Sequence, residues 1–130
     1  LSIRRQRQMC IRDSIKSVEE FEDRNCIKVV CDQESNAMYF SREPIPTQSK
    51  SENISMKKQV CIIPFRRDFL FEYTSLDTTP LEIAESVDMM RVLEHSLKIK
   101  MIPTKFQTYA VDTKADLLRV ERIMREMPSE

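Results

Sequence analysis

The sequence of 130 residues contains no glycine at all. Average glycine usage near 7% would place roughly nine glycines in a chain of this length. Without glycine the chain can form neither a G-x-G-x-x-G turn nor a P-loop, the two structures that bring a backbone close to phosphate. Any phosphate binding by these residues must therefore use other groups.

Excess charge and long apolar runs are also missing. Lysine plus arginine and aspartate plus glutamate number 21 each, so no global field attracts nucleic acid or an anionic membrane. No apolar run approaches the ~20 residues that a membrane span needs, and the basic N-terminus lacks the apolar core of a signal peptide. We expect one soluble, cytoplasmic domain without a nucleic-acid or membrane partner.

The thiol and imidazole groups are too few, and too widely spaced, to indicate a metal centre. The four cysteines form no C-x-x-C pair, and His95 is the single histidine. Cys26, Cys31 and Cys61 fall in apolar, strand-like runs, which predicts reduced thiols that pack as small hydrophobic groups. A disulfide between two of the cysteines is the alternative.

The first 14 residues do not match the rest of the chain. Residues 5–14, RQRQMCIRDS, look like the translation of a sequencing adapter joined to an open reading frame. We therefore predict that residues 1–14 are non-native and lie outside the fold, and that residues 15–130 form the domain. The alternative is a basic arm for nucleic acid, although no aromatic stacking partner lies nearby.

From Ile15 onward, apolar strand-like runs alternate with helical patterns, which predicts an α/β fold. The runs that read as strands are residues 26–31, 37–40, 60–65, 98–102 and, briefly, 109–111. A helical turn or loop is expected over residues 15–23, and a short helix is expected to open at residues 66–68 and to carry Phe69, Leu70 and Tyr73. The polar residues 47–57 predict an exposed loop.

Two further helices carry matching start signals. Thr79-Pro80-Leu81-Glu82 has a hydroxyl at the N-cap, proline at N1 and a carboxylate at N3, which is a capping box, and the helix is expected to end near Ser96. Thr113 and Asp116 offer a similar cap for the final helix. Apolar residues at helical spacing predict that this last helix packs into the core through Leu117, Val120, Ile123, Met124 and Met127.

The stretch from Asn36 to Pro46, NAMYFSREPIP, is the most informative part of the sequence. An apolar strand runs directly into a charged loop in which Pro44 and Pro46 restrict the backbone and disfavour a helix. Such a junction fixes Arg42 in space, where its guanidinium could meet an anion. The alternative is an ordinary surface charge at the edge of a sheet.

Together with residues 28–32, KVVCD, this stretch resembles the "KVV-x-D-x-x-x-x-A-x-YFSR-x-PIP" signature of the CMP-Kdo synthetase family, the 3-deoxy-manno-octulosonate cytidylyltransferases. Residues 79–91 resemble the family's "SPLE-x-x-E-x-LEQLR" helix, and residues 111–117 are similar to its "GVDTPEDL". The resemblance extends over nearly all of residues 15–127. Family members are much longer on the N-terminal side, so it implies the C-terminal half of a mixed-sheet, Rossmann-like nucleotide-sugar transferase fold.

The resemblance implies transfer of CMP from CTP to a Kdo-like ulosonic acid with release of pyrophosphate, for lipopolysaccharide or surface polysaccharide synthesis. Mg²⁺ and a homodimer are implied with it. The absent half would include the CTP-binding loop and the carboxylate of the "GDEP" motif, so we expect these 130 residues to be inactive alone, with an unpaired sheet edge and an uncovered apolar face. The alternative is a non-catalytic interaction or dimerisation module that has lost nucleotide binding.

The family's motifs also imply site residues, none of them catalytic. Asp112 corresponds to a metal-binding aspartate, with a helix cap as the alternative. The implied substrate-binding residues are Arg42, Arg66, Gln59, Glu85 and Asp88, with Arg42 gripping a carboxylate or phosphate. The chain departs from the family where residues 59–66, QVCIIPFR, replace "HLGIYGYR", and where residues 87–91, VDMMR, replace "LEQLR". The lost histidine and glutamine belong to the sugar side, which leaves the identity of the sugar acid open.

Overall fold

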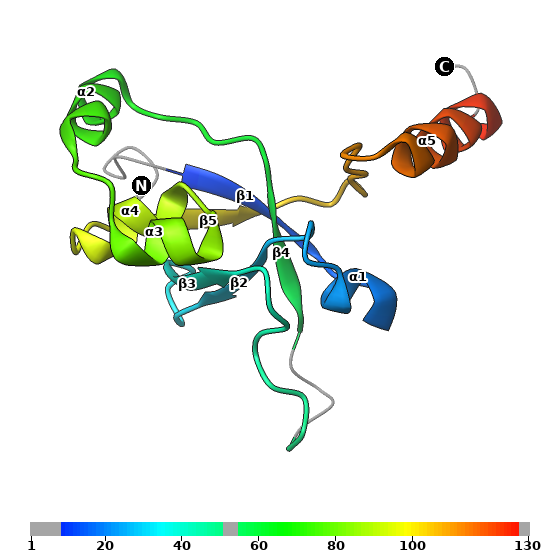
Figure 1. Ribbon diagram of the computed structural model, residues 1–130, viewed down its shortest axis with the longest axis horizontal. Helices are drawn as coiled ribbons and strands as arrows, with labels where there is room; N and C mark the ends of the chain where they lie inside the picture. The colour runs from blue at the N-terminus through cyan, green and yellow to red at the C-terminus, as the bar shows by residue number, and fades with distance from the viewer. Residues whose placement is uncertain (1–8, 51–54, 128–130) are drawn as a thin grey trace.

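The computed structural model describes residues 9–50 and 55–127 of the chain (Figure 1). In these residues five strands form a mixed sheet, and five helices lie between or after the strands along the chain, which confirms the predicted α/β class. Along the chain the elements are β1 (Met9–Ser14), α1 (Val18–Glu22), β2 (Lys28–Cys31), β3 (Ala37–Ser41), β4 (Lys57–Val60), α2 (Arg67–Ser75), α3 (Pro80–Glu85), α4 (Met89–Glu94), β5 (Lys100–Pro103) and α5 (Lys114–Glu126).

The strands lie in the order β3-β2-β4-β1-β5. β1 runs parallel to β5, with Ile11 opposite Ile102, and antiparallel to β4, with Ile11 opposite Val60. The other pairs are antiparallel. Strand β1 therefore lies inside the sheet, between two partners.

The two edge strands of this sheet meet at one end. The Ala37 amide donates to the Ile99 carbonyl at 2.8 Å, and the Met101 amide donates to the Ser35 carbonyl at 2.8 Å, on either side of a bridge between Asn36 and Lys100. Main-chain groups that an open edge would leave unpaired are satisfied here. The expected unpaired edge is thus wrong for this end of β3 and β5.

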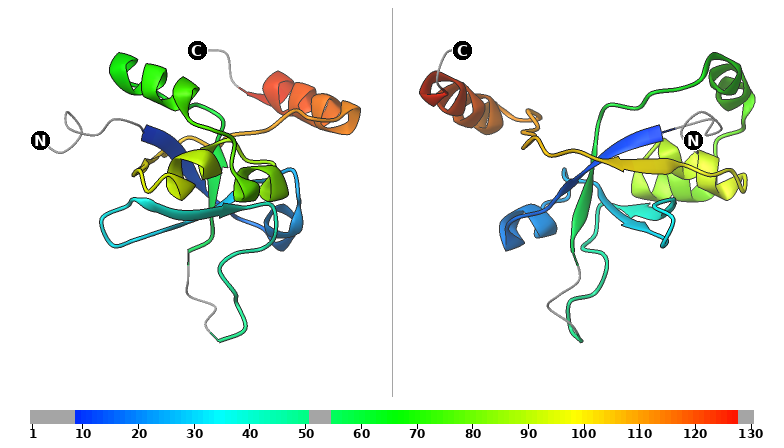
Figure 2. Two further views of the ribbon diagram at one scale, coloured as in Figure 1. Left: turned by 60° about the vertical axis from the view of Figure 1, so that its left-hand side comes forward. Right: turned by 180° about the vertical axis from the view of Figure 1, so that it is seen from behind.

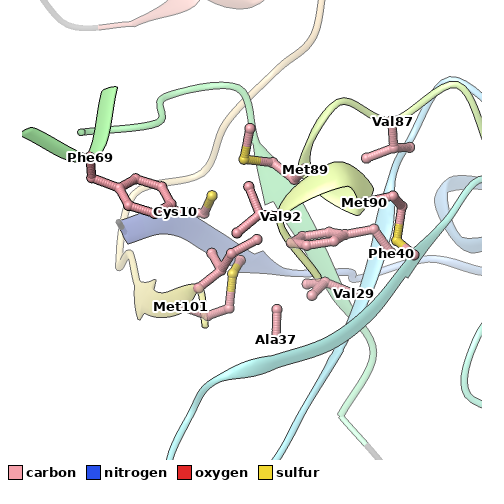
Figure 3. Close-up of a cluster of buried hydrophobic side chains, with 11 residues drawn as sticks. Cys10, Val29, Ala37, Phe40, Phe69, Val87, Met89, Met90, Val92 and Met101 are labelled. Atoms are coloured by element: carbon pink, nitrogen blue, oxygen red, sulfur yellow. The ribbon is translucent and has the colours of Figure 1, made fainter. Parts of the chain in front are cut away.

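The core lies between one face of the sheet and helix α4, with Val87 from the connection between α3 and α4 and one side chain from α2 (Figure 3). Phe40 of β3 and Met101 of β5 are completely buried, and Val92 of α4 packs into the same cluster. Unbranched methionines fill irregular gaps well, which suits a small core between a curved sheet and short helices. The remaining buried members of the cluster are Cys10, Val29, Ala37, Phe69, Val87, Met89, Met90 and Ile99.

The expectation that residues 1–14 lie outside the fold is wrong for residues 9–14. They form β1, and the Cys10 side chain is completely buried in the core, where burial raises the pKa of its thiol to about 12. Main-chain pairing with β4 on one side and β5 on the other places this strand inside the sheet. Residues 1–8 lie outside the described part, and a non-native origin of the segment stays a prediction.

The third buried strand is not residues 60–65 but β4, Lys57–Val60. The buried ammonium of Lys58 is satisfied within the fold, because it forms ion pairs with Glu20 and, at 3.8 Å, with Asp13 on the neighbouring strand. The apolar residues that follow are outside the sheet, and Ile62 is 60% exposed. Within the described residues the brief strand at 109–111 is absent as well.

The cysteines differ from expectation in one case. Cys61, predicted to be buried, is exposed just after β4, whereas Cys26 and Cys31 are half-buried. All four cysteines are free, so the structure contains none of the disulfides left open above.

The predicted helix from Pro80 to about Ser96 is broken in two. Ser86 adopts a left-handed conformation with φ of 53° and ends α3, and α4 begins three residues later. Ser35 and Ser96 have positive φ as well, at 64° and 60°. Such angles strain any residue with a Cβ and are usually taken by glycine. In this glycine-free chain serine takes three of these positions.

Helix α5 stands apart from the rest of the fold, beyond the extended segment that follows β5 (Figures 1 and 2). It starts at the predicted cap, but none of its residues is buried. The prediction that its apolar stripe belongs to the core is therefore wrong for this chain. Among the helices in residues 9–50 and 55–127, none combines the length and the apolar character required to cross a bilayer.

Candidate functional site

The Glu85 carboxylate joins α3 to the end of β3, inside the stretch that the sequence singled out. Its oxygens accept hydrogen bonds from the Tyr39 hydroxyl at 3.0 Å, the Ser41 hydroxyl at 2.9 Å and the Arg42 amide at 3.2 Å. Three donors to one half-buried carboxylate fix both elements, because removal of any partner leaves a polar group unpaired. Burial of Tyr39, and then its hydrogen bond with Glu85, raise the pKa of the tyrosine.

The Arg42 side chain is bound to main-chain carbonyls. Its Nε donates to the Glu85 carbonyl at 3.0 Å, Nη2 to the Ser86 carbonyl at 2.9 Å and Nη1 to the Arg24 carbonyl at 3.0 Å. The guanidinium therefore satisfies the last carbonyls of α3, where a cation is favoured. Of its five N–H donors, these bonds leave one on each Nη for an anion.

A second cation lies beneath this loop. Lys28 is completely buried, and its ammonium donates to the Arg42 carbonyl at 2.5 Å and to the Asp23 carbonyl at 2.7 Å. Burial without a paired carboxylate lowers the pKa of Lys28. Lys28 and Arg42 thus place two cationic groups at one end of β3 in a chain that has no net charge overall.

The predicted capping residue Glu82 belongs to a second polar cluster. The Arg91 guanidinium donates to both Glu82 oxygens, at 2.8 and 2.6 Å, and lies 5.2 Å from the centre of the Tyr73 ring. The arginine hydrogen bonds hold the pKa of Glu82 below its usual value. This cluster fastens α2, α3 and α4 together, and Asp88, exposed at the start of α4, lies beside it and makes no side-chain cap bond.

Gln59 has a polar atom that nothing in the described residues satisfies. The side chain is 9% exposed, its Nε2 lies 4.0 Å from the Cys10 sulfur, and its Oε1 is buried without a hydrogen-bond partner. Arg12 is opposite Gln59 in the β1–β4 ladder, and its Nε is buried and unpartnered too. Arg12 was not predicted as a site residue, because residues 1–14 were interpreted as a non-native segment. Unsatisfied buried groups are costly, and each could bind a polar ligand.

The remaining predicted residues are dispersed. Arg66 is the exposed N-cap of α2, and Asp112 is exposed in the segment before α5. No hydrogen bond or ion pair in the described residues connects Gln59, Arg66, Asp88 or Asp112 with the Arg42–Glu85 junction. The structure therefore brings together two of the six predicted residues.

Asp112 is the residue that the family motif assigns to Mg²⁺. No group of three or more His, Cys, Asp and Glu side chains suited to a metal ion occurs in residues 9–50 and 55–127. Magnesium in nucleotide sites is commonly held by one or two carboxylates, with phosphate oxygens and water as the other ligands. Asp112 fits the role of one protein ligand, but the described residues do not form a complete site.

Comparison with known proteins agrees with the motifs. Residues 6–99 match the family model described as cytidylyltransferase. The 3-deoxy-manno-octulosonate cytidylyltransferase of Fusobacterium nucleatum is 40% identical over 116 residues, which cover 89% of this chain and 47% of the relative. That of Geobacter metallireducens is 36% identical over 127 residues, with 88% and 50% covered.

A solved structure is similar to this chain in its fold as well. It is described as CMP:2-keto-3-deoxy-manno-octonic acid synthetase complexed with CTP, and it superposes with a TM-score of 0.82 at 30% identity. The superposition covers 93% of this chain and 50% of the other, which confirms the nucleotidyltransferase type of α/β fold. The chain spans about half the length of the curated relatives it matches.

Proposed function

The chain belongs to the cytidylyltransferase family, and from that premise we propose that the full-length protein transfers CMP from CTP to a Kdo-like ulosonic acid and releases pyrophosphate. The observation that carries the proposal is the 40% identity, over 89% of this chain, to a curated enzyme named for that reaction. The product would serve lipopolysaccharide or surface polysaccharide synthesis. A cytoplasmic location, where CTP is made, and a homodimer belong to the same proposal.

These residues would contribute the sugar-acid side of the site. The free N–H donors on the two Nη atoms of Arg42 are suited to a carboxylate, which a guanidinium binds in a bidentate manner. The unpartnered Gln59 Oε1 is suited to a sugar hydroxyl, which can donate to it. Glu85 would hold Arg42 in place, and Arg66 and Asp88 stay candidates for contacts with the sugar.

The reaction needs positioning and neutralisation of charge more than covalent chemistry by the protein. The anomeric hydroxyl of the sugar acid would attack the α-phosphate of CTP, and pyrophosphate would leave. Mg²⁺ would neutralise phosphate charge, and Asp112 would be its one ligand from these residues. With a single carboxylate and no CTP loop among the described residues, we expect no turnover from the 130 residues alone.

Binding of the sugar acid tests the proposal directly. In a ¹⁵N NMR titration with Kdo, the Gln59 side-chain amide and the Arg42 Nε–H signals should shift and saturate. Mannose, which has hydroxyls but no carboxylate, is the matched control and should leave the Arg42 signal in place. If Kdo at tens of millimolar moves neither signal, the sugar-acid assignment is wrong.

The alternative is a non-catalytic interaction or dimerisation module, and the exposed apolar side of α5 is the observation that favours it. The two functions differ in one measurable respect. A full-length protein of the proposed kind releases pyrophosphate from CTP when Kdo and Mg²⁺ are present, whereas an interaction module does not.

A further inference from the structure

The Lys58 side chain connects β4 with α1, with β1 and with the segment that leads to Asp112. Its buried ammonium forms an ion pair with Glu20 of α1 and, at 3.8 Å, with Asp13 of β1. The same ammonium donates a hydrogen bond to the Thr108 carbonyl at 3.3 Å. An ammonium carries three N–H donors, so it can serve all three of these groups. The Lys58 node is the set Lys58, Asp13, Glu20 and Thr108.

Thr108 is attached to the node at two points. Its carbonyl accepts from Lys58, and its hydroxyl donates to Asp13 Oδ2 at 3.3 Å. Asp13 is held in turn, because its Oδ1 accepts from the Ser14 amide at 2.7 Å. Thr108 is also the one residue between positions 105 and 115 that is not exposed. Two bonds to one residue fix the direction of the chain as well as its position.

The chain beyond Thr108 has no further attachment of this kind. Within residues 9–50 and 55–127, no hydrogen bond joins residues 109–112 to the sheet, and the helix that follows has no buried residue. Asp112 is exposed, four residues after Thr108. Four residues span at most about 14 Å when fully extended. The position of Thr108 therefore limits where the Asp112 carboxylate can lie.

A metal ligand needs such a limit. Mg²⁺ demands near-ideal octahedral geometry, and a ligand has to be held close to its productive position by the groups around it. A carboxylate on a free stretch of chain loses conformational entropy when it binds, which weakens the metal site. Any contact that orders the chain before Asp112 reduces this loss.

We propose that Lys58 is a positioning residue for Asp112, because the Lys58 node fixes the chain at Thr108, four residues before the carboxylate that would bind Mg²⁺. The proposal rests on the proposed function, in which Asp112 is the metal ligand. Lys58 itself contacts neither metal nor substrate. An ion pair with a structural role alone would support α1 and β4 and leave the metal affinity unchanged.

NMR relaxation of the metal-free 130-residue chain tests the positioning. Thr108→Val removes the hydroxyl at almost constant volume, and the ¹⁵N order parameters of residues 109–112 should fall below about 0.6, the value of flexible backbone. Those of β2 and β3 should stay as they are. Glu20→Gln is the matched control, because it weakens the node on the side of α1 and does not touch Thr108. It should lower the free energy of unfolding and leave residues 109–112 unchanged.

Metal affinity is measured in a chimera in which the N-terminal half of the Fusobacterium nucleatum relative is joined in frame to this chain. Mn²⁺ binding without nucleotide is followed by electron paramagnetic resonance. Thr108→Val should raise the Mn²⁺ dissociation constant about tenfold, as the loss of a group that orients a ligand does. Asp112→Asn should raise it at least as much, and Glu20→Gln should not change it.

Variants of Lys58 extend this test. Lys58→Met should weaken Mn²⁺ binding as Thr108→Val does, and Lys58→Arg, which keeps the charge and the donors, should retain most of the affinity. Lys58→Met leaves two carboxylates without their cation and can prevent folding, so Thr108→Val decides the outcome. With CTP and Kdo, Thr108→Val should raise the Mg²⁺ concentration for half-maximal pyrophosphate release and leave the rate at saturating Mg²⁺ near that of the wild type.

Three results overturn the proposal. In the first, residues 109–112 keep their order parameters in Thr108→Val. In the second, Thr108→Val binds Mn²⁺ as tightly as the wild type while Asp112→Asn binds it weakly, so that Asp112 is a ligand that the node does not position, and the proposed function stands. In the third, Asp112→Asn also binds Mn²⁺ as tightly as the wild type, and the metal role of Asp112 in the proposed function fails together with this proposal.

Discussion

Helices α3 and α5 begin with the same local signal and end in opposite environments. Each has a threonine N-cap with a carboxylate at N3, Thr79 with Glu82 and Thr113 with Asp116. Glu82 is buried at the centre of a polar cluster, whereas no residue of α5 is buried. Capping chemistry determines where a helix starts, and the rest of the protein determines whether it is buried.

The difference arises from contacts distant in sequence. Glu85 of α3 accepts from two donors on β3 and from the amide of Arg42, which follows that strand, and the Glu94 carboxylate accepts from the Leu81 amide at 3.0 Å. The ion pairs of α5 join residues three and four apart in the same helix. Helix α3 is thus fixed by tertiary contacts and α5 by local ones.

The largest expected effect is the difference in stability between a variant in the buried core and a variant in helix α5. Phe40→Ala should lower the free energy of unfolding by about 3–5 kcal/mol, because Phe40 is completely buried and its removal leaves a cavity. Met124→Ala on α5 should change it by less than about 0.5 kcal/mol. Urea denaturation of both variants measures the contrast, and equal losses would mean that the α5 stripe is buried in this chain.

The ion pair of Glu82 in α3 should contribute more to the free energy of unfolding than the ion pair of Asp116 in α5. Arg91→Met leaves Glu82 largely buried without its partner and should cost about 3 kcal/mol. Arg119→Met removes an exposed pair and should have no measurable effect on global unfolding. A comparable loss in both variants would contradict the assigned burial.

Lowering the pH should affect stability differently through the two capping carboxylates, Glu82 of α3 and Asp116 of α5. The pKa of Glu82 is lowered by its Arg91 hydrogen bonds, and that of Asp116 by the Thr113 hydroxyl. A carboxylate with a lower pKa in the folded state contributes stability that is fully present above its unfolded pKa, about 4.3 for Glu, and is lost as the pH falls through the folded value.

Unfolding free energies measured as the pH is lowered from about 5 should therefore fall, and Glu82→Gln should flatten that fall. Asp116→Asn should leave the global curve as it is and reduce only the helical circular-dichroism signal from α5. If the unfolding free energy of Glu82→Gln falls with pH in parallel with the wild type, Glu82 is not the group that causes the loss of stability in acid.

The smallest effect concerns the missing glycines. Ser86→Gly should stabilise the chain by about 0.5–1 kcal/mol, because glycine relieves the left-handed strain at the end of α3 at some entropic cost. Ala115→Gly in α5 should lower helical content with no change in global stability. Thermal unfolding of the two variants gives the comparison, and a destabilised Ser86→Gly would contradict it.

Local signals predicted the parts of the fold that local chemistry decides. The start of α5, the N-cap of α2 and strand β3 appear where the sequence placed them. The break at Ser86 was not predictable in this way, because helical spacing continues through it and the Arg42 bonds that cap α3 come from a residue 43 positions earlier.

Strands β1 and β4 show a second limit of predicting the fold from local sequence signals. Their polar residues read as loop or foreign sequence, and only the ion pairs of Lys58 with Asp13 and Glu20, from three different elements, make burial of β4 acceptable. Pairing between such distant segments has no signature in either segment alone.

The candidate site was predicted through resemblance more than through pattern. The strand-to-loop junction correctly marked Arg42 as a fixed residue, yet its carbonyl partners Arg24, Glu85 and Ser86 could not be read from the sequence. Gln59 was identified because it stands where the family has histidine. The substrate-binding and metal roles of these residues stay predictions.

Pyrophosphate release tests the central claim, that these residues supply one half of a cytidylyltransferase site. The 130-residue chain is assayed with CTP, Mg²⁺ and Kdo beside a chimera in which the N-terminal half of the Fusobacterium nucleatum relative is joined in frame to this chain. The account predicts background release from the chain alone and release well above background from the chimera. Turnover by the chain alone would contradict it, and so would an inactive chimera whose β2 and β3 amides are protected from hydrogen exchange and which is therefore folded.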